Sequence, residues 1–143
     1  MGKKKAPDYS ITDIRLEDCL PIRQRVLGPT LTQDECRVPH DETACHLGGY
    51  LNSDLIACVS LFRLDADTVQ LRKFAVLPEF QGHGLGSLII QSTFERCREQ
   101  GFTLMTLDAR VTATRFYDKH GMTPVGDIFF KGTIKHIRMI KPL

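Results

Sequence analysis

The sequence predicts a mixed α/β domain whose sheet is mostly antiparallel and contains one parallel strand pair. Two observations lead to this fold class. Several short β-rich segments follow one another and precede a helical segment. After that helical segment come a strand, a second helix and two further strands. A strand also passes through a glycine-rich loop directly into the longest amphipathic segment of the chain, so a helix crosses over between two strands.

The N-terminal third predicts one strand and one helix. Tyr9–Ile14 is expected to form a short strand, and Glu17–Leu27 a helix that tolerates Pro21 in its first turn. Gly28-Pro29 ends this helix. Thr30–Thr43 is polar and irregular, with a short helix expected from Thr32.

The next segments predict three antiparallel strands in succession. Cys45–Leu51 and Leu55–Phe62 are separated by Asn52-Ser53-Asp54, a triplet typical of a turn. After a second turn, Thr68–Val76 forms the third strand and leads into the glycine-rich loop.

The helix after the loop is predicted at Ser87–Gln100. Ile90, Phe94 and Cys97 recur at helical spacing, and Leu88 and Ile89 are expected to widen the apolar face. Gly101 suits the position just after a helix. Thr103–Asp108 then forms a strand parallel to Thr68–Val76, as a crossover helix requires.

The C-terminal part predicts a second helix and a closing hairpin. Thr112–His120 is expected to be helical and to end at Gly121, and Val125–Phe130 and Lys135–Ile140 to pair around a turn. We therefore expect a single domain over residues 9–143, with residues 1–8 as a disordered tail.

Composition narrows the class of protein. The chain has 143 residues, of which 42% are hydrophobic, and a net charge of +2, which is too small to indicate nucleic-acid binding. We find no apolar run of the ~18 residues that a membrane span needs and no signal peptide. The five cysteines are scattered, so they indicate reduced thiols in a cytoplasmic protein rather than a zinc site or a disulfide framework.

The strongest local signal is the loop Gln81-Gly82-His83-Gly84-Leu85-Gly86. Glycines at a helix start let backbone N–H groups approach an anion, and the helix dipole adds partial positive charge there. A diphosphate is the ligand to expect first. The Walker loop is excluded because no lysine precedes Ser87, and a dinucleotide-binding Rossmann loop is disfavoured because Ile89 occupies the place of its third glycine.

The pattern Gln-x-x-Gly-x-Gly at Gln81–Gly86 resembles the coenzyme A diphosphate loop of the GNAT superfamily of acyl-CoA-dependent N-acyltransferases. A second segment, Thr114-Arg115-Phe116-Tyr117-Asp118-Lys119-His120-Gly121-Met122, is similar to that family's helix with Phe-Tyr-x-Lys before a glycine. The resemblance implies the GNAT fold, with helices on both faces of the sheet and the parallel strands splayed around the pantetheine arm.

The resemblance also implies the cofactor-binding residues. The backbone N–H groups of Gly82, Gly84, Leu85, Gly86 and Ser87 would face the diphosphate, with Gln81 at the start of the motif and His83 in a variable position. The backbone of Phe74, Ala75 and Val76 would pair with the pantetheine amides as an added strand does. Tyr117 would donate a proton or a hydrogen bond to the departing thiolate.

The general base stays open. Some relatives carry a glutamate on the strand before the loop, but Gln70 stands at that position here. The remaining candidates are Asp108, Glu79, His46, His136 or a chain of water molecules. Arg72, Asp108 and His136 are our candidate acceptor residues, and cationic side chains near them favour an amine that also carries an anionic group.

We therefore expect an acetyl-CoA-dependent N-acetyltransferase that transfers the acetyl group directly to a primary amine of a small molecule. We expect no metal, no nucleic acid and no membrane partner, and a homodimer stays open. The alternatives are a domain of the same fold that binds acyl-CoA as a sensor without turnover, and the disfavoured dinucleotide binder.

Overall fold

A computed structural model describes residues 8–143, and the sheet it contains has seven strands in the hydrogen-bonded order β1-β2-β3-β4-β5-β7-β6. The pair β4 and β5 is parallel, and the pairs β1–β2, β5–β7 and β6–β7 are antiparallel. The mixed α/β fold class is thereby confirmed. The strands are β1 (Tyr9–Asp13), β2 (Cys45–Leu51), β3 (Asp54–Arg63), β4 (Thr68–Val76), β5 (Leu104–Arg110), β6 (Thr123–Lys131) and β7 (Ile134–Pro142).

The helices are α1 (Leu16–Leu27), α2 (Leu85–Glu99) and α3 (Thr114–Lys119), with short 3₁₀ turns between the elements. Every predicted strand and both long helices exist, with bounds that differ by a few residues. The short helix expected from Thr32 is a single 3₁₀ turn at Asp34–Cys36. The second-motif helix is shorter than predicted because a 3₁₀ turn at Val111–Ala113 precedes it.

The chain groups into two compact units. The first unit takes the chain up to Ser60 together with Lys73–Gly86. In it β1 pairs along its whole length with β2, and Asp8, which we assigned to the tail, donates its N–H to Asn52 Oδ1 at 3.2 Å. The core of this unit contains Cys19, Ile22, Cys58 and Ala75. The expected disorder of residues 1–7 lies outside the described residues.

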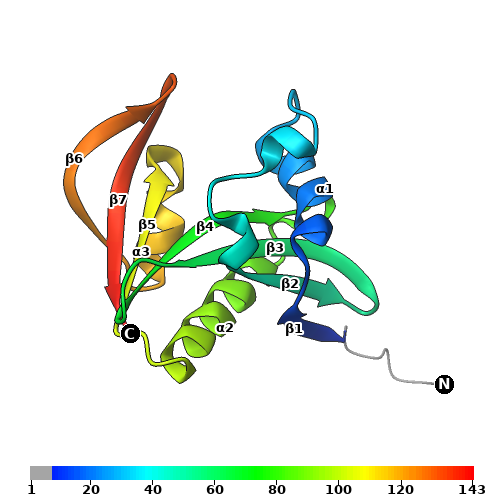
Figure 1. Ribbon diagram of the computed structural model, residues 1–143, viewed down its shortest axis with the longest axis horizontal. Helices are drawn as coiled ribbons and strands as arrows, with labels where there is room; N and C mark the ends of the chain where they lie inside the picture. The colour runs from blue at the N-terminus through cyan, green and yellow to red at the C-terminus, as the bar shows by residue number, and fades with distance from the viewer. Residues whose placement is uncertain (1–7) are drawn as a thin grey trace. The chain divides into compact units, whose positions relative to one another are not determined.

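The second unit takes Leu61–Arg72 together with Ser87–Leu143. In it β6 and β7 form a long hairpin, and β7 also pairs with β5 (Figure 1). The predicted apolar face of α2 is confirmed, since Ile90, Phe94 and Cys97 are fully buried. Leu88 was wrongly included in that face and is 51% exposed. Its position lies two residues before Ile90, which is ~200° around a helix.

Strand β6 ends the sheet and is irregular. Its pairing with β7 shifts register between Val125 and Phe129, around Gly126, whose φ is +76°. Pro124 removes one backbone donor near its start. The side chains of Ile128 and Phe130 on this strand are exposed, Phe130 by 62%.

Within 8–143, no helix combines the length and the apolar character that crossing a membrane requires. Over the same range, no three or more His, Cys, Asp or Glu side chains are grouped so that they could hold a metal ion.

Candidate active site

The glycine loop is built by a turn, two glycines in an unusual conformation and a helix start. A 3₁₀ turn at Pro78–Phe80 follows β4, and Gln81 Nε2 then donates to the carbonyl of Val76 at 2.7 Å. Gly82 and Gly84 both have φ of +80°, a region that glycine adopts without the strain other residues meet. α2 begins at Leu85, directly after the second of these glycines.

The loop is also open. A Cβ atom placed on Gly82 or Gly84 would meet no heavy atom within 4 Å, and residues 81–84 are exposed. The first N–H groups of α2 have no acceptor within the helix. This geometry therefore leaves backbone donors and the positive end of a helix dipole accessible to an anion.

Strand β4 departs from regular extended geometry just before the loop. Lys73 has φ of +56°, so it is left-handed within a strand. The strict alternation that would place Gln70, Arg72, Phe74 and Val76 on one face is interrupted there, and both Ala75 and Val76 are buried. No residue pattern predicted the left-handed conformation of Lys73, because a lysine at positive φ is uncommon.

The parallel strands pair over a short stretch and then separate. In the second unit, β4 and β5 pair only from Thr68 with Leu104 to Gln70 with Thr106. β5 continues to Arg110 while pairing with β7 alone. The hydroxyl of Thr106 lies at this point and is buried without a hydrogen-bond partner in the described part of the chain. A buried hydroxyl without a partner is costly, so it is a suitable contact for a polar ligand.

Tyr117 lies on α3 and packs edge-on against Phe116, with ring centroids 5.2 Å apart. Burial raises the pKa of its phenol to about 12. The side chain is therefore a neutral hydrogen-bond donor at physiological pH.

Two of the three candidate acceptor residues lie on neighbouring strands of the second unit. Asp108 on β5 is opposite Arg138 on β7, and Arg110 is opposite His136, so the four side chains share one face of the sheet. Asp108, only 10% exposed, accepts from Lys131 at 3.1 Å and from Arg138 at 3.2 Å. The third candidate, Arg72, places its guanidinium 5.5 Å from the ring centre of Phe62.

The geometry separates the candidates for general base. Burial alone would raise the pKa of Asp108, but Lys131 and Arg138 outweigh it and lower that pKa, which makes Asp108 a weak base. Glu79 forms an ion pair with Arg25. His136 directs Nδ1 to the carbonyl of Ile134 at 3.0 Å, which leaves the lone pair of Nε2 as the basic site.

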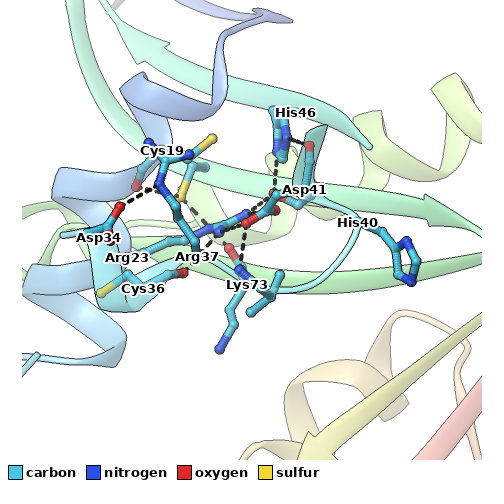
Figure 2. Close-up of polar contacts among 12 residues, drawn as sticks. Cys19, Arg23, Asp34, Cys36, Arg37, His40, Asp41, His46 and Lys73 are labelled. Carbon is cyan, nitrogen blue, oxygen red and sulfur yellow. Dashed lines mark hydrogen bonds and ion pairs between the residues drawn. The ribbon is translucent and has the colours of Figure 1, made fainter. Parts of the chain in front are cut away.

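His46, the fourth candidate, belongs to a buried polar network in the first unit (Figure 2). Its Nδ1 lies 2.7 Å from Ser60 Oγ and its Nε2 lies 2.8 Å from the carbonyl oxygen of Asp41. Arg23 forms two 2.8 Å hydrogen bonds with the Asp41 carboxylate, and both side chains are almost completely buried. Since both ring nitrogens are engaged, His46 serves structure in this arrangement.

The same network surrounds a cysteine that the sequence did not single out. The pKa of Cys19 is lowered to about 6, chiefly by a hydrogen bond with Cys58, and His46 and Arg23 add to the lowering against the effect of burial. Cys58 and His46 lie far from Cys19 in the chain, so no local motif indicates these contacts. Cys19 is fully buried, so a bulky thioester cannot reach it.

A family profile described as "Acetyltransferase (GNAT) family" matches residues 9–122, which is most of the chain and includes both motifs. The chain belongs to the GNAT family of acetyltransferases. It is therefore an acetyltransferase enzyme, and the resemblance seen in the two motifs is confirmed.

Three proteins named as acetyltransferases are similar to it over nearly their whole length. YitI of Bacillus subtilis (strain 168), an uncharacterised N-acetyltransferase, is 28% identical over 142 residues, which covers 93% of this chain and 95% of YitI. A GNAT family acetyltransferase from Elizabethkingia anophelis, solved with acetyl-CoA bound, has a TM-score of 0.74 at 14% identity and covers 94% of this chain and 98% of its own. The ribosomal-protein-S18-alanine N-acetyltransferase from Escherichia coli has a TM-score of 0.77 at 18% identity and covers 94% of each chain. The two structural likenesses show the fold.

GNAT enzymes use acetyl-CoA, and the glycine loop of this GNAT chain fits its diphosphate. The open glycine loop at the start of α2 suits the diphosphate, since no side chain would fill the space above Gly82 and Gly84.

Proposed function

We propose that this GNAT enzyme transfers the acetyl group of acetyl-CoA directly to a primary amine of a small molecule. The glycine loop carries the proposal. Gly82 and Gly84 hold the backbone in a conformation suited to glycine, and the helix start behind them is accessible. The N–H groups of Gly82, Gly84, Leu85, Gly86 and Ser87 bind the diphosphate, with Gln81 fixing the loop to the end of β4.

Acetyl-CoA supplies an activated thioester. The amine nitrogen attacks the carbonyl carbon, a C–N bond forms, the C–S bond breaks and its electron pair stays on sulfur. The phenol of Tyr117 has a pKa of about 12, well above the ~8.5 of a cysteine thiol. Complete proton transfer from the phenol to a thiolate would be uphill, so Tyr117 acts as a hydrogen-bond donor to the departing sulfur.

The amine must lose a proton on attack, and we assign this step to His136. Asp108 is held anionic by two cations, Glu79 is paired and His46 is engaged at both nitrogens. His136 has its Nδ1 fixed by a backbone carbonyl and its ring stacked on Phe129 at 6.0 Å between centroids. Its Nε2 is oriented and, in the neutral ring, carries the lone pair that a general base requires. His136→Ala should lower kcat, and added imidazole should restore part of it.

The acceptor is a small amine with an anionic group. The sheet face around Asp108 carries three cationic side chains, those of Arg110, Lys131 and Arg138. The carboxylate of Asp108 balances only one of these charges, so the face has an excess of positive charge. Arginine binds carboxylate and phosphate groups through paired hydrogen bonds. A cationic polyamine would be repelled from such a face.

Calorimetry with acetyl-CoA, followed by a thiol-release assay over a panel of amines, tests the whole proposal. The panel contains amino acids, amino-sugar phosphates, polyamines, lysine peptides and a peptide with an N-terminal alanine. We expect binding of acetyl-CoA and the fastest thiol release with an anionic small amine. Absence of acetyl-CoA binding, or of thiol release with every amine, would overturn the activity. Preference for polyamines or peptides would overturn only the acceptor class.

A further inference from the structure

Three side chains from two helical segments form a hydrogen-bonded row beside the start of α2. Ser87 and Gln91 lie four residues apart, on the same face of α2. The imidazole of His120, which follows α3 directly, lies between them. Its Nε2 is 3.0 Å from Ser87 Oγ and its Nδ1 is 2.8 Å from Gln91 Nε2. All three residues belong to the second unit.

The backbone and a neighbouring ring hold this imidazole in place. The N–H of His120 donates to the carbonyl of Tyr117 at 3.1 Å and closes the last turn of α3. Gly121, with φ of +86°, then turns the chain away. The ring of Phe116 packs edge-on against the imidazole with centroids 4.9 Å apart. The orientation of His120 is therefore set before any ligand arrives.

The hydrogen bonds determine which ring nitrogen carries the proton. Burial, with the positive charges of Lys119 and Lys141, lowers the pKa of His120, so the ring is neutral at physiological pH. A neutral imidazole has one donor and one acceptor nitrogen. The amide nitrogen of Gln91 can only donate, so Nδ1 accepts and Nε2–H donates to Ser87 Oγ.

This tautomer has a consequence for the serine. Ser87 Oγ accepts the hydrogen bond from His120 Nε2–H, so the hydroxyl proton of Ser87 is left to donate elsewhere. Ser87 is the third residue of α2, where backbone N–H groups already lack intrahelical acceptors. We propose that His120 and Gln91 are positioning residues that hold Ser87 as an added side-chain donor to a diphosphate oxygen of the bound nucleotide thioester. The proposal rests on the proposed acetyl-CoA function, and it assigns roles to His120 and Gln91 that the motif itself does not contain.

The test compares a ligand with the diphosphate and one without it. Binding of CoA and of pantetheine, which lacks the diphosphate, is measured by calorimetry, and KM and kcat are measured with acetyl-CoA. Ser87→Ala and His120→Ala should each weaken CoA binding and raise KM at least about tenfold, which is the lower end of the effect expected for a hydrogen bond to a charged group. Neither pantetheine binding nor kcat at saturation should change by more than about twofold.

Two additional variants separate positioning from general structural damage. His120→Gln keeps an N–H donor on a side chain of similar reach, so it should recover most of the CoA affinity. The double variant Ser87→Ala/His120→Ala should bind CoA no more weakly than either single variant, because both remove the same interaction. Glu99→Ala, on the exposed end of α2, is the matched control and should leave both affinities unchanged.

Long-range ¹H–¹⁵N NMR of the histidine ring gives an independent readout, and we expect the Nε2–H tautomer in both the free and the CoA-bound protein. The Nδ1–H tautomer in the bound protein would overturn the proposal. So would wild-type CoA affinity in His120→Ala, or equal losses for CoA and pantetheine. In each of these cases, CoA binding by the wild type would still support the acetyltransferase function. Failure of the wild type to bind CoA would instead overturn both the acetyltransferase function and the positioning roles of His120 and Gln91.

Discussion

At the scale of single residues, the diphosphate loop depends on backbone conformations that side chains adopt only with strain. Gly82 and Gly84 share a φ of +80°, and both face open space. Any substitution there has two effects, since it strains the backbone and it places atoms where the anion is expected to bind. Gly101, at the other end of α2, has φ of +90° and equally open surroundings, so it provides a control for the first effect alone.

Gly84→Glu should weaken acetyl-CoA binding by at least about tenfold, or ~1.4 kcal/mol, because a carboxylate would repel the diphosphate. Gly101→Glu should cost a similar backbone strain and leave the affinity unchanged. Calorimetry on both folded variants measures the difference in their affinity for acetyl-CoA. Equal affinity in the two variants would remove the loop from the cofactor site.

Tyr117→Phe removes only a hydroxyl, so the edge-on packing with Phe116 should survive. We expect kcat to fall by roughly 10²-fold or more while acetyl-CoA affinity stays within about twofold. The phenol is active in its neutral form, and this form is lost only as pH rises through about 12. Steady-state kinetics should therefore show no decline of the wild-type kcat from this group up to about pH 10. A wild-type kcat in Tyr117→Phe would make the residue structural.

At the scale of elements, the buried ion pair between Arg23 and Asp41 connects a helix, two 3₁₀ turns and a strand of the first unit. Arg23 on α1 contacts Asp41 in a 3₁₀ turn, the carbonyl of Cys36 in another turn and Ser60 on β3 (Figure 2). A buried pair of this kind adds little compared with an apolar replacement, but loss of one partner leaves an unpaired buried charge. A second pair on the same helix, Arg25 with Glu79, is half exposed and makes an internal comparison possible.

Asp41→Leu should lower the free energy of unfolding by about 3–5 kcal/mol, because it leaves the Arg23 guanidinium buried without its counter-ion. Glu79→Leu, the matched control, should change it by no more than about 1 kcal/mol, since exposed pairs contribute little. Urea denaturation of both variants measures the two costs. Similar costs would mean that the Arg23–Asp41 pair is not the junction of this unit.

The sequence predicted the elements better than it predicted the contacts between them. Periodicity marked α2 and the strands, and Gln81–Gly86 marked the loop, because these signals depend on neighbouring residues. The left-handed Lys73 and the bonds of Arg23 to Asp41 and of Ser87 to His120 were missed. The two pairs are separated by 18 and 33 positions, and no local rule reports such distances. That residues 9–143 form one domain stays a prediction.

At the scale of the whole molecule, the route of transfer can be tested without knowledge of the acceptor. Four of the five cysteines are buried and Cys45 is partly buried. We expect the intact mass of the protein to stay unchanged after incubation with acetyl-CoA alone. A stoichiometric acetyl adduct that is then discharged to an amine would replace direct transfer with an acetyl-enzyme route. Cys45→Ser would then test whether the partly buried cysteine carries it.

The irregular strand β6 bears on how the protein behaves at high concentration. An end strand with unpaired backbone groups and exposed Ile128 and Phe130 could recruit the same strand of another molecule and nucleate aggregates. Here Pro124 withholds one donor, and the register shift around Gly126 keeps a continuous ladder from extending along the strand. The irregular edge strand thereby disfavours association between molecules through β6, and changes that straighten it would promote such association.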